Sequence, residues 1–311
     1  MSEETKLKFT AILKTVVRIA IGAFFITSAI LKLLSLDTFE LYIYSFNIFG
    51  FSLSTVAARA VIACELLAGA LMISKIHYRE AWWLTMAMLA GFTLLLVYTA
   101  LFRNDQNCHC LGDIVELKPS LSIVKNIITI LLMLPIRNET DYMFKGKKAL
   151  LITFLAASLA VPFALFPTDN VYNLFKKGEK PVDEATFNAF LQDSVMRNVN
   201  IADGNHIVGV LSSGCEFCRI SALKISEIVE NNDLDSSKVV FFVWGGDNSV
   251  EKFKSETNTG KFRYIPIDPL VAVRMVNGSF PTYLYVSSDE EIVRTASLRQ
   301  MTEKSVVEHL R

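Results

Sequence analysis

Hydrophobic positions divide the chain into two parts of different character. Up to about residue 167, long apolar stretches alternate with short polar segments, and five stretches are long enough to cross a bilayer as helices. These stretches lie near 15–35, 53–74, 80–102, 120–136 and 148–167. Lys125 and Asn126 interrupt the fourth. The short connections between the stretches are typical of an antiparallel bundle, so the pattern predicts a helical membrane domain.

After residue 182 the pattern changes to short apolar runs that alternate with helical segments. Runs rich in Val, Ile and Phe predict β-strands at 206–211, 238–244, 282–286 and 292–295. Helical spacing of apolar residues predicts helices at 183–192, 220–229, 250–256 and 302–310, the last with Thr302 as its N-cap. After the first helix the order is strand, helix, strand, helix, strand, strand, helix. This order predicts an α/β domain.

Composition limits the class of protein. The chain has 311 residues, 52% of them hydrophobic, so it is long enough for two domains and too apolar for one ordinary soluble protein. Its formal net charge is zero, and nothing indicates a nucleic-acid partner. Lysines lead into the first apolar stretch without a small-residue cleavage site, so we expect that stretch to remain as an anchor. We predict a four-span membrane domain at 1–147, a fifth span at 148–167, a polar tether at 168–182 and an α/β domain at 183–311.

The basic residues predict the direction of the spans, because cytoplasmic segments carry an excess of Lys and Arg. With the N-terminus inside, nine basic residues fall on the inner side: Lys6, Lys8, Lys14, Lys75, Arg79, Arg137, Lys145, Lys147 and Lys148. Four fall on the outer side: Lys32, Arg59, Arg103 and Lys118. Five crossings then place the C-terminal domain outside, in a compartment where disulfides persist. We expect a protein of the bacterial cytoplasmic (inner) membrane with a periplasmic C-terminal domain.

Cys215 and Cys218 follow the first predicted strand of this domain and open a predicted helix. A cysteine at a helix N-terminus faces unpaired N–H groups and the positive end of the dipole, which stabilise its thiolate. A partner three residues later lies one turn away and can close a disulfide. We therefore expect Cys215 to attack and Cys218 to resolve the mixed disulfide. The alternatives are a structural disulfide or a zinc half-site, although no second pair is near in sequence to complete about four ligands.

The region 183–311 resembles the thioredoxin fold. The resemblance is carried by Cys215-Glu-Phe-Cys218 at a strand-to-helix junction and by Phe280-Pro281-Thr282 before a hairpin. Ile267-Asp268-Pro269 is similar to the membrane-tethered, TlpA-type branch of that family. The resemblance implies that Pro281 is a cis-proline beside the active-site disulfide.

Two positions depart from the family pattern. Gly214 stands where the family usually has tryptophan, and Glu216 stands where strong oxidants carry histidine. An acidic neighbour disfavours the thiolate, so we expect a less oxidising couple than that of a strong disulfide donor.

Cys108 and Cys110 lie in a polar loop between the third and fourth apolar stretches, on the same predicted side as the C-terminal domain. A disulfide between cysteines one residue apart closes a small ring and is strained, so it is easier to reduce and more oxidising. Such a pair suits electron transfer. The alternatives are a local clip, or a copper or zinc site that uses His109. Cys64, in the middle of the second stretch, is interpreted as a small buried apolar residue.

The first four spans resemble the MauE/DoxX-like membrane family over about residues 10–136. The residues that carry this resemblance are Arg18-Ile-Ala-Ile-Gly22, Ser28-Ala-Ile-Leu-Lys32, Glu65, Arg103, Cys108-His-Cys-Leu-Gly112 and Asn126. The MauE branch typically carries Cys-Gly-Cys-Phe-Gly, so His109 and Leu111 are departures. The resemblance implies disulfide formation during maturation of exported enzymes and, in the DoxX branch, quinone-linked electron transfer.

Ionisable residues inside a membrane are costly and usually face the bundle interior. Glu65 lies deep in the second apolar stretch, where it is either half of a structural ion pair or a relay for protons released by thiol oxidation. Asn126 is a candidate for a hydrogen bond between helices. We expect no metal, and a quinone is the expected cofactor. The candidates for its site are Lys32, Glu65, Arg103 and Asn126.

Two dithiols that face one compartment predict a membrane thiol–disulfide oxidoreductase. In the predicted relay, cysteines of extracytoplasmic client proteins reduce Cys215–Cys218, that pair reduces Cys108–Cys110, and a quinone takes the electrons. The layout is similar in logic to vitamin K epoxide reductase homologues fused to thioredoxin domains. Two alternatives stay open: a TlpA-type reductant with the opposite flow, and a membrane scaffold for maturation of exported proteins. The sequence makes no prediction of the oligomeric state.

Overall fold

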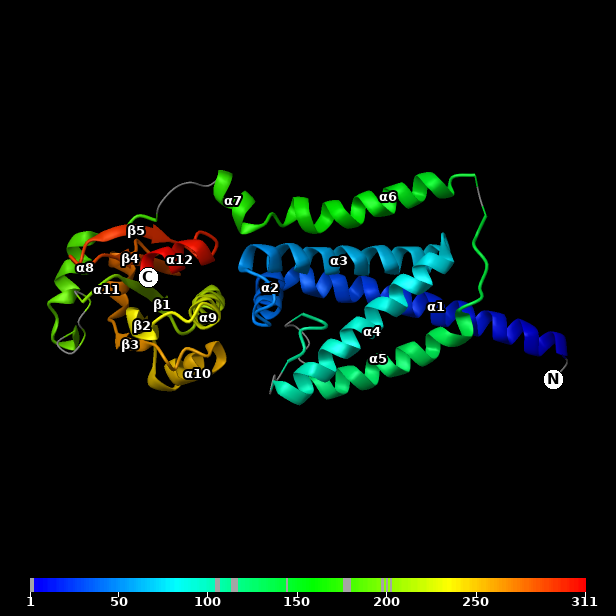
Figure 1. Cartoon of the computed structure of the whole chain (residues 1–311), viewed down its shortest axis with the longest axis horizontal. Coiled ribbons are helices and arrows are strands. Elements are labelled where there is room, and N and C mark those ends of the chain that lie inside the picture. Colours follow the sequence, from blue (N-terminus) through cyan, green and yellow to red (C-terminus); the bar gives the residue numbers. More distant parts are fainter. Residues whose placement is uncertain are drawn as a thin grey trace. The chain divides into compact units, whose positions relative to one another are not determined.

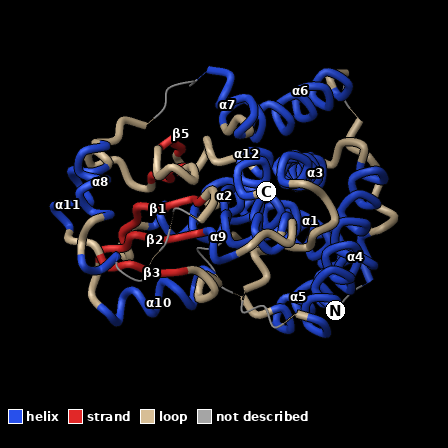
Figure 2. The backbone as a smooth tube through the Cα atoms, turned by 60° about the vertical axis from the view of Figure 1, so that its left-hand side comes forward, coloured by secondary structure: helices blue, strands red, loops and turns tan. Residues whose placement is uncertain are grey.

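The chain is seen in a computed structural model that describes residues 3–103, 107–112, 117–143, 145–175, 180–196, 199, 201 and 203–311. It divides into two compact units (Figures 1 and 2). The first consists of Met1–Tyr42 and Thr55–Pro167, and the second of Ile43–Ser54 and Thr168–Arg311. The second unit therefore includes a short segment from the N-terminal part of the sequence.

The first unit is a bundle whose long helices agree with the five predicted spans. They are α1 (Glu3–Leu34), α3 (Phe51–Ser74), α4 (Tyr78–Phe102), α5 (Pro119–Met133, continued by a 3-10 turn to Ile136) and α6 (Lys147–Ala160, continued by a π turn to Leu165). A short helix that the sequence pattern does not show, α2 (Leu36–Tyr44), follows α1. Its nine residues are too few to cross a bilayer, so a search for long apolar stretches passes over it.

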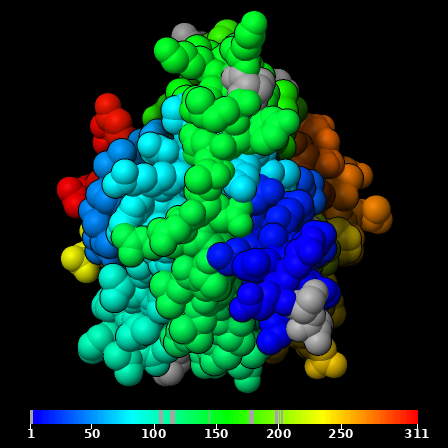
Figure 3. All heavy atoms as spheres, turned by 90° about the vertical axis from the view of Figure 1, so that its right-hand side faces the viewer, coloured from blue at the N-terminus to red at the C-terminus, as the bar shows by residue number. Residues whose placement is uncertain are grey.

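All five long helices are long and apolar enough to cross a membrane. Large apolar side chains are exposed on their outer faces, as at Leu94, Leu101 and Phe102 of α4. In Figure 3 the first turns of α1 (dark blue) lie on the outside of the unit, and Leu7 and Phe9 are exposed there. Charged residues are instead buried in the bundle: Arg18, Lys32, Glu40, Arg59 and Glu65. Apolar side chains on the outer faces and charged side chains in the interior are the arrangement expected of a bundle in lipid. The chain is therefore a multi-pass membrane protein.

Small residues let two helices of the bundle approach closely. A Cβ placed on Gly22 of α1 would lie 2.9 Å from the carbonyl oxygen of Gly69 of α3. Such pairs of small residues are common where membrane helices pack. Between α4 and α5, Trp82 donates its indole N–H to the carbonyl of Met133 at 2.9 Å. This bond ties α4 to the end of α5.

The second unit is built on a five-stranded sheet, red in Figure 2. Its strands are β1 (His206–Ser212), β2 (Val239–Trp244), β3 (Arg263–Pro266), β4 (Thr282–Val286) and β5 (Ile292–Ala296). Their order is β3-β2-β1-β4-β5; β1, β2 and β3 are parallel, and β4 and β5 run antiparallel to their neighbours. The sequence prediction omits β3, because four residues are too few to show a pattern.

Helices cover both faces of the sheet. On one face, α8 (Glu184–Leu191) and α11 (Pro269–Met275) pack through Phe187 and Met275 against Val210 and Leu284. On the other, Tyr283 of β4 donates to Ser221 of α9 (Glu216–Asn231). Two further helices of this unit are α10 (Asp247–Thr257) and α12 (Glu303–Leu310). Three layers with this strand order form the thioredoxin-like fold that the sequence predicts, with α11 as an addition to the predicted elements.

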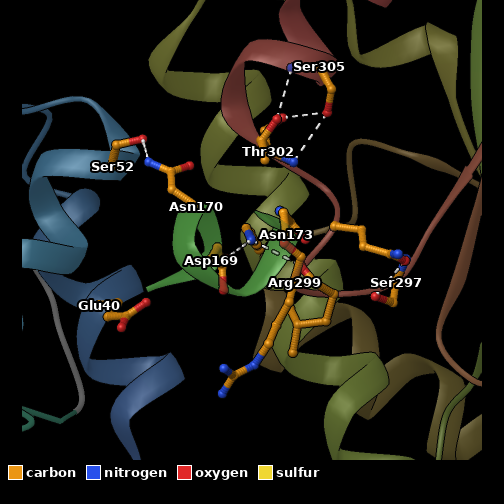
Figure 4. A network of polar contacts seen from close by, with 12 residues as sticks. Glu40, Ser52, Asp169, Asn170, Asn173, Ser297, Arg299, Thr302 and Ser305 are labelled. Atoms are coloured by element: carbon orange, nitrogen blue, oxygen red, sulfur yellow. Dashed lines mark hydrogen bonds and ion pairs between the residues drawn. The ribbon is translucent and has the colours of Figure 1, made fainter. Parts of the chain in front are cut away.

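The segment 168–182 differs from the polar tether that the sequence predicts. It begins with a helix, α7 (Asp169–Phe175), and residues 176–179 lie outside the described residues. Asp169 accepts a hydrogen bond from Lys224 of α9 at 2.8 Å. Asn173 donates to the carbonyl of Arg299 at 3.0 Å (Figure 4). The first half of the segment is therefore packed within the second unit, and the tether prediction is wrong for residues 169–175.

The segment Ile43–Ser54 is an integral part of the second unit. The hydroxyl of Tyr44 donates to one carboxylate oxygen of Glu303 at 2.8 Å, and the Phe51 N–H donates to the other at 2.7 Å. The buried ammonium of Lys224 lies 4.3 Å from the centre of the Phe51 ring. A buried charge is costly unless it is paired, and Lys224 is held by this ring, by Asp169 and by a carbonyl.

Candidate functional site

Cys215 occupies the predicted position at the start of a helix. It is the N-cap of α9, and its sulfur accepts the backbone N–H of Cys218 at 3.3 Å. Cys215 is partly exposed, whereas Cys218 is completely buried. Burial raises the pKa of the Cys218 thiol, and the hydrogen bond with Cys215 adds to the rise. The geometry therefore favours Cys215 as the sulfur that meets other thiols and Cys218 as the protonated partner behind it.

Pro281 lies at the same edge of the sheet as this pair. The Phe280–Pro281 peptide bond is cis, as the resemblance implies. β4 begins at Thr282, which pairs with Val210 near the end of β1, and β1 leads into Cys215. The rings of Trp244 and Phe280 lie edge to face there, with centroids 6.4 Å apart.

The second cysteine pair lies in the described loop 107–112 of the first unit. Cys108 is 3% exposed, and Cys110 is half-buried. The sulfur of Cys108 accepts the backbone N–H of Cys110 at 3.3 Å and lies 3.0 Å from the hydroxyl oxygen of Ser122. Asn107 holds the loop in shape, since its side-chain oxygen accepts the N–H groups of His109 and Leu117.

These contacts make the two loop sulfurs unequal. The hydrogen bonds from Cys110 and Ser122 lower the pKa of Cys108 to about 6, against the opposing effect of burial. The pKa of Cys110 is raised, first by its interaction with Cys108 and then by burial. Ser122 belongs to the first turn of α5, where the helix dipole also favours negative charge. In the reduced pair, the negative charge therefore resides on Cys108.

A buried ion pair lies directly beneath this loop. The ammonium of Lys32 on α1 donates to Glu65 of α3 at 2.7 Å, to Ser28 at 2.7 Å and to the carbonyl of Cys110 at 2.8 Å. Ser28 also donates to the Cys110 carbonyl at 2.9 Å. Both charged side chains are about 3% exposed. The second carboxylate oxygen of Glu65 is buried without a hydrogen-bond partner among the described residues.

The structure brings together only part of the predicted cofactor set. Lys32 and Glu65 form one pair, which connects to the cysteine loop. Asn126 instead donates to Thr93 of α4 at 3.2 Å, as expected of a bond between helices. Arg103 ends α4, where its backbone N–H donates to the carbonyl of Thr99.

Arg59, the other charge singled out in the sequence, has a structural partner. It forms a buried ion pair with Glu40 of α2 and donates to the carbonyls of Phe166 and Pro167 at the end of the fifth span. No partner for Arg59 was predicted, because α2 does not stand out in the apolar pattern of the sequence. The pair joins three helices and is remote in sequence from both cysteine pairs.

The remaining sequence candidates have simpler settings. His109 takes a positive φ of 50°, and its ring lies against Tyr42 with centroids 4.6 Å apart. Cys64 is half-buried in α3 rather than fully buried. Across the ranges that the structure describes, no group of three or more His, Cys, Asp and Glu side chains is placed to hold a metal ion.

For three residues near the loop cysteines, the sequence did not predict a place at the site. Ser122 and Lys125 come from α5, and Asn107 comes from the loop itself. Their positions beside the cysteines depend on how α5 packs, and a serine in a helical turn carries no signal of its own. Of the three, only Asn107 has a signal in the sequence. It lies one residue before Cys108, and Asn side chains in turns often bond to nearby backbone.

Comparison with known proteins identifies the region that holds this loop. Residues 10–136 match the family model of the methylamine utilisation protein MauE. The match covers the span over which the sequence resembles that family, including Lys32, Glu65 and both loop cysteines. The MauE-like region and the thioredoxin-like region are therefore two parts of one chain.

Similarity also extends beyond the MauE-like region. Protein TlpB of Flavobacterium psychrophilum is 25% identical over 304 residues, which is 89% of this chain and 76% of that protein. Among solved structures, a secreted Mycobacterium tuberculosis disulfide oxidoreductase homologous to E. coli DsbE is 16% identical and covers 34% of this chain and 80% of its own. Its TM-score is 0.28, so the fold of the second unit rests on its own strand order. The chain is thus similar to MauE in its first unit and to TlpB over most of its length.

Proposed function

We propose that the chain oxidises client thiols and passes their electrons through both cysteine pairs. A client thiolate attacks Cys215 of the Cys215–Cys218 disulfide, and a second client thiol releases Cys215, which leaves the client oxidised and the pair reduced. The reduced pair then exchanges with the Cys108–Cys110 disulfide, so that the loop becomes a dithiol. Two electrons and two protons move at each exchange.

The observation that carries this proposal is the construction of the loop pair. Cys108 is hydrogen-bonded to Ser122 of α5, and the Cys110 carbonyl accepts from Lys32 of α1, while Asn107 accepts the N–H of His109 between the two cysteines. A local clip needs no buried ion pair beneath it and no hydroxyl on one of its sulfurs. Burying Lys32 and Glu65 is costly in itself, which favours a role for them at this site.

A quinone is the acceptor that we propose for the loop dithiol. Glu65 is the residue that suits its chemistry, because its second oxygen is buried without a partner among the described residues and, once protonated, can donate a hydrogen bond to a quinone oxygen. Glu65 would hold the group beside Lys32, whose three N–H groups already donate to Glu65, Ser28 and the Cys110 carbonyl. When bound, the group would take up two electrons and two protons. The chain's own part is to hold Cys108 as the thiolate and to offer Glu65 as an acceptor for the protons released.

The proposed orientation has the N-terminus in the cytoplasm and the thioredoxin-like unit outside, in the periplasm of a bacterium. The charge bias of nine to four supports it. Two of the four outer charges, Lys32 and Arg59, lie in buried ion pairs.

The opposite flow, in which Cys215–Cys218 acts as a reductant, is the second candidate. Glu216 is exposed beside Cys215, and an acidic neighbour favours a less oxidising couple. Cys64 is the only cysteine within the five spans, however, and a conduit for cytoplasmic electrons needs more than one. Rapid acid trapping in growing cells separates the two: a mostly oxidised Cys215–Cys218 pair supports oxidation of clients, and a mostly reduced pair supports the reverse.

The direct test of the relay is a trap for its intermediate. Cys218→Ser leaves Cys215 unable to be released, so a disulfide between Cys215 and the loop is expected to accumulate. Cys64→Ser, in the same background, is the control and is expected to leave the trapped species unchanged. Non-reducing peptide mapping detects it. If the loop cysteines never appear joined to Cys215 under oxidising conditions, the relay is wrong.

A further inference from the structure

The two sulfurs of the loop pair differ in how an incoming thiol can reach them. Cys108 is 3% exposed, whereas Cys110 is half-buried. In thiol–disulfide exchange, the thiolate must approach the sulfur that it attacks along the line of the disulfide bond. Access therefore favours attack at Cys110.

The same two sulfurs differ in how well they carry negative charge. The sulfur of Cys108 accepts the Cys110 N–H and lies 3.0 Å from the hydroxyl of Ser122, which is fully buried. Ser122 stands in the first turn of α5, so its hydrogen bond and the helix dipole act in the same direction. Exchange is faster when the departing sulfur is the more stable thiolate. Stabilisation therefore favours departure of Cys108.

We infer that the incoming thiolate bonds to Cys110 and expels Cys108, and that Ser122 is the positioning residue that decides this order. The inference rests on the proposed function, which leaves open the loop cysteine that joins Cys215. The lowered pKa of Cys108 and the raised pKa of Cys110 agree with it.

Each step balances without a further reagent. The Cys215 thiolate forms a bond to the sulfur of Cys110, the Cys108–Cys110 bond breaks, and its electron pair leaves on Cys108. Cys218 then loses its proton and attacks Cys215, which closes the Cys215–Cys218 disulfide. The Cys215–Cys110 bond breaks, and Cys110 takes up a proton.

The ion pair beneath the loop holds Cys110 during this exchange. Lys32 and Ser28 both donate to the Cys110 carbonyl, at 2.8 and 2.9 Å. The Cys110 backbone is thereby fixed while its sulfur changes partner. The charged groups that face the pair are Lys125 of α5, Lys32 of α1 and Glu65 of α3, and His109 lies between the cysteines. Any pH profile of Cys108 must therefore be compared between variants that keep all four groups.

The first test compares two full-length variants that each keep Cys215 and one loop cysteine. Cys108→Ser with Cys218→Ser keeps Cys110, and Cys110→Ser with Cys218→Ser keeps Cys108. Both are treated in detergent with a mild oxidant, and the cross-link to Cys215 is followed on non-reducing gels. We expect the variant with Cys110 to cross-link at least about 10-fold faster, because Cys110 is the less buried residue of the pair.

The second test addresses Ser122 in the reduced full-length protein. The pH dependence of iodoacetamide alkylation at Cys108 is read by peptide mass spectrometry. Ser122→Ala is expected to raise its midpoint by about one pH unit, since one hydrogen bond to the thiolate is lost. Ser122→Thr, which keeps a hydroxyl, is expected to retain most of the native midpoint. Ser120→Ala, an exposed position in the same turn, is the matched control and is expected to change nothing.

The outcomes separate this inference from the proposal beneath it. Equal or faster cross-linking of Cys108 overturns the order of attack and leaves the relay standing. Cross-linking in neither variant overturns both. An unchanged alkylation midpoint in Ser122→Ala shows that Ser122 does not stabilise the Cys108 thiolate, whatever the cross-linking result is.

Discussion

The two cysteine pairs share one local arrangement and differ in which sulfur it serves. In each pair, one sulfur accepts the backbone N–H of its partner at 3.3 Å and is associated with the first turn of a helix. In the second unit the accepting sulfur is Cys215, the more exposed of its pair. In the first unit it is Cys108, the more buried of its pair.

This difference gives the pairs complementary reactivity. A stabilised and accessible thiolate, as at Cys215, is suited to attack. An accessible sulfur whose partner is a stabilised leaving group, as at Cys110, is suited to be attacked. Two pairs with the same polarity would each present a nucleophile. Variants that remove the exposed sulfur of either pair, or that change the charge near it, break this contrast.

The largest effect is expected from removing the exposed sulfur of either pair. Cys215→Ala or Cys110→Ala should slow oxidation of a dithiol peptide by membranes that contain the protein by at least about 100-fold, because the exchange passes through that sulfur. Cys64→Ala is the control and should stay within about twofold of the native rate, since Cys64 lies in α3 and outside the exchange. Full activity of Cys110→Ala would mean that the loop pair is not in the path.

The next effect concerns the buried Lys32–Glu65 ion pair, which lies next to the cysteine loop of the first unit. Lys32→Met leaves the Glu65 carboxylate buried without its cation, at a cost of about 3–5 kcal/mol in unfolding free energy. Lys32→Met with Glu65→Leu should recover much of that loss, because no charge remains buried. Lys304→Met removes one partner of an exposed pair in the second unit and should have little effect. Unfolding by sodium dodecyl sulfate, followed by circular dichroism, measures all three; equal losses would contradict the role of burial.

The third effect is a difference in pH dependence between the pairs. The pKa of Cys108 is lowered to about 6 from an ordinary value of about 9, whereas burial raises the pKa of Cys218. Alkylation of Cys108 in the reduced protein should therefore level off near pH 7, while that of Cys218 should still rise at pH 9. By linkage, the stability that the Cys108 thiolate contributes is complete above about pH 9 and is lost as the pH falls through 6. Parallel profiles for the two cysteines would remove the contrast.

The smallest effect is expected at Glu216, whose substitution changes the reduction potential of the Cys215–Cys218 pair only. Glu216→His replaces a negative neighbour of Cys215 with one that can be positive, which stabilises the reduced form. We expect the reduction potential of the Cys215–Cys218 couple to rise by about 30 mV in a glutathione titration. Glu308→His, an exposed change on α12, is the control. A fall in potential would show that Glu216 does not act through its charge.

The sequence pattern predicted the long helices well, but it did not predict several short helices and one short strand. The other four spans and the predicted strands lie within a few residues of their predicted bounds, whereas α1 begins at Glu3, well before the predicted start near residue 15. Thr302 caps α12 with a reciprocal bond to Ser305. Among the α-helices and strands that the structure describes, α2, α7, β3 and α11 were not predicted. Each spans nine residues or fewer, over which neither helical nor strand spacing stands out from the background. Their contacts within the folded units stabilise them.

The site divides in the same way. The sequence alone determined that Cys215 begins a helix and that Lys32 and Glu65 are charges inside the membrane, because capping, periodicity and hydropathy are local properties. Only the tertiary structure decided that Lys32 pairs with Glu65 and that Ser122 bonds to Cys108, since these partners lie 33 and 14 residues apart. The charge on a loop sulfur depends on donors that reach it from other helices. The sequence around two neighbouring cysteines therefore does not predict which of their thiolates the folded bundle stabilises.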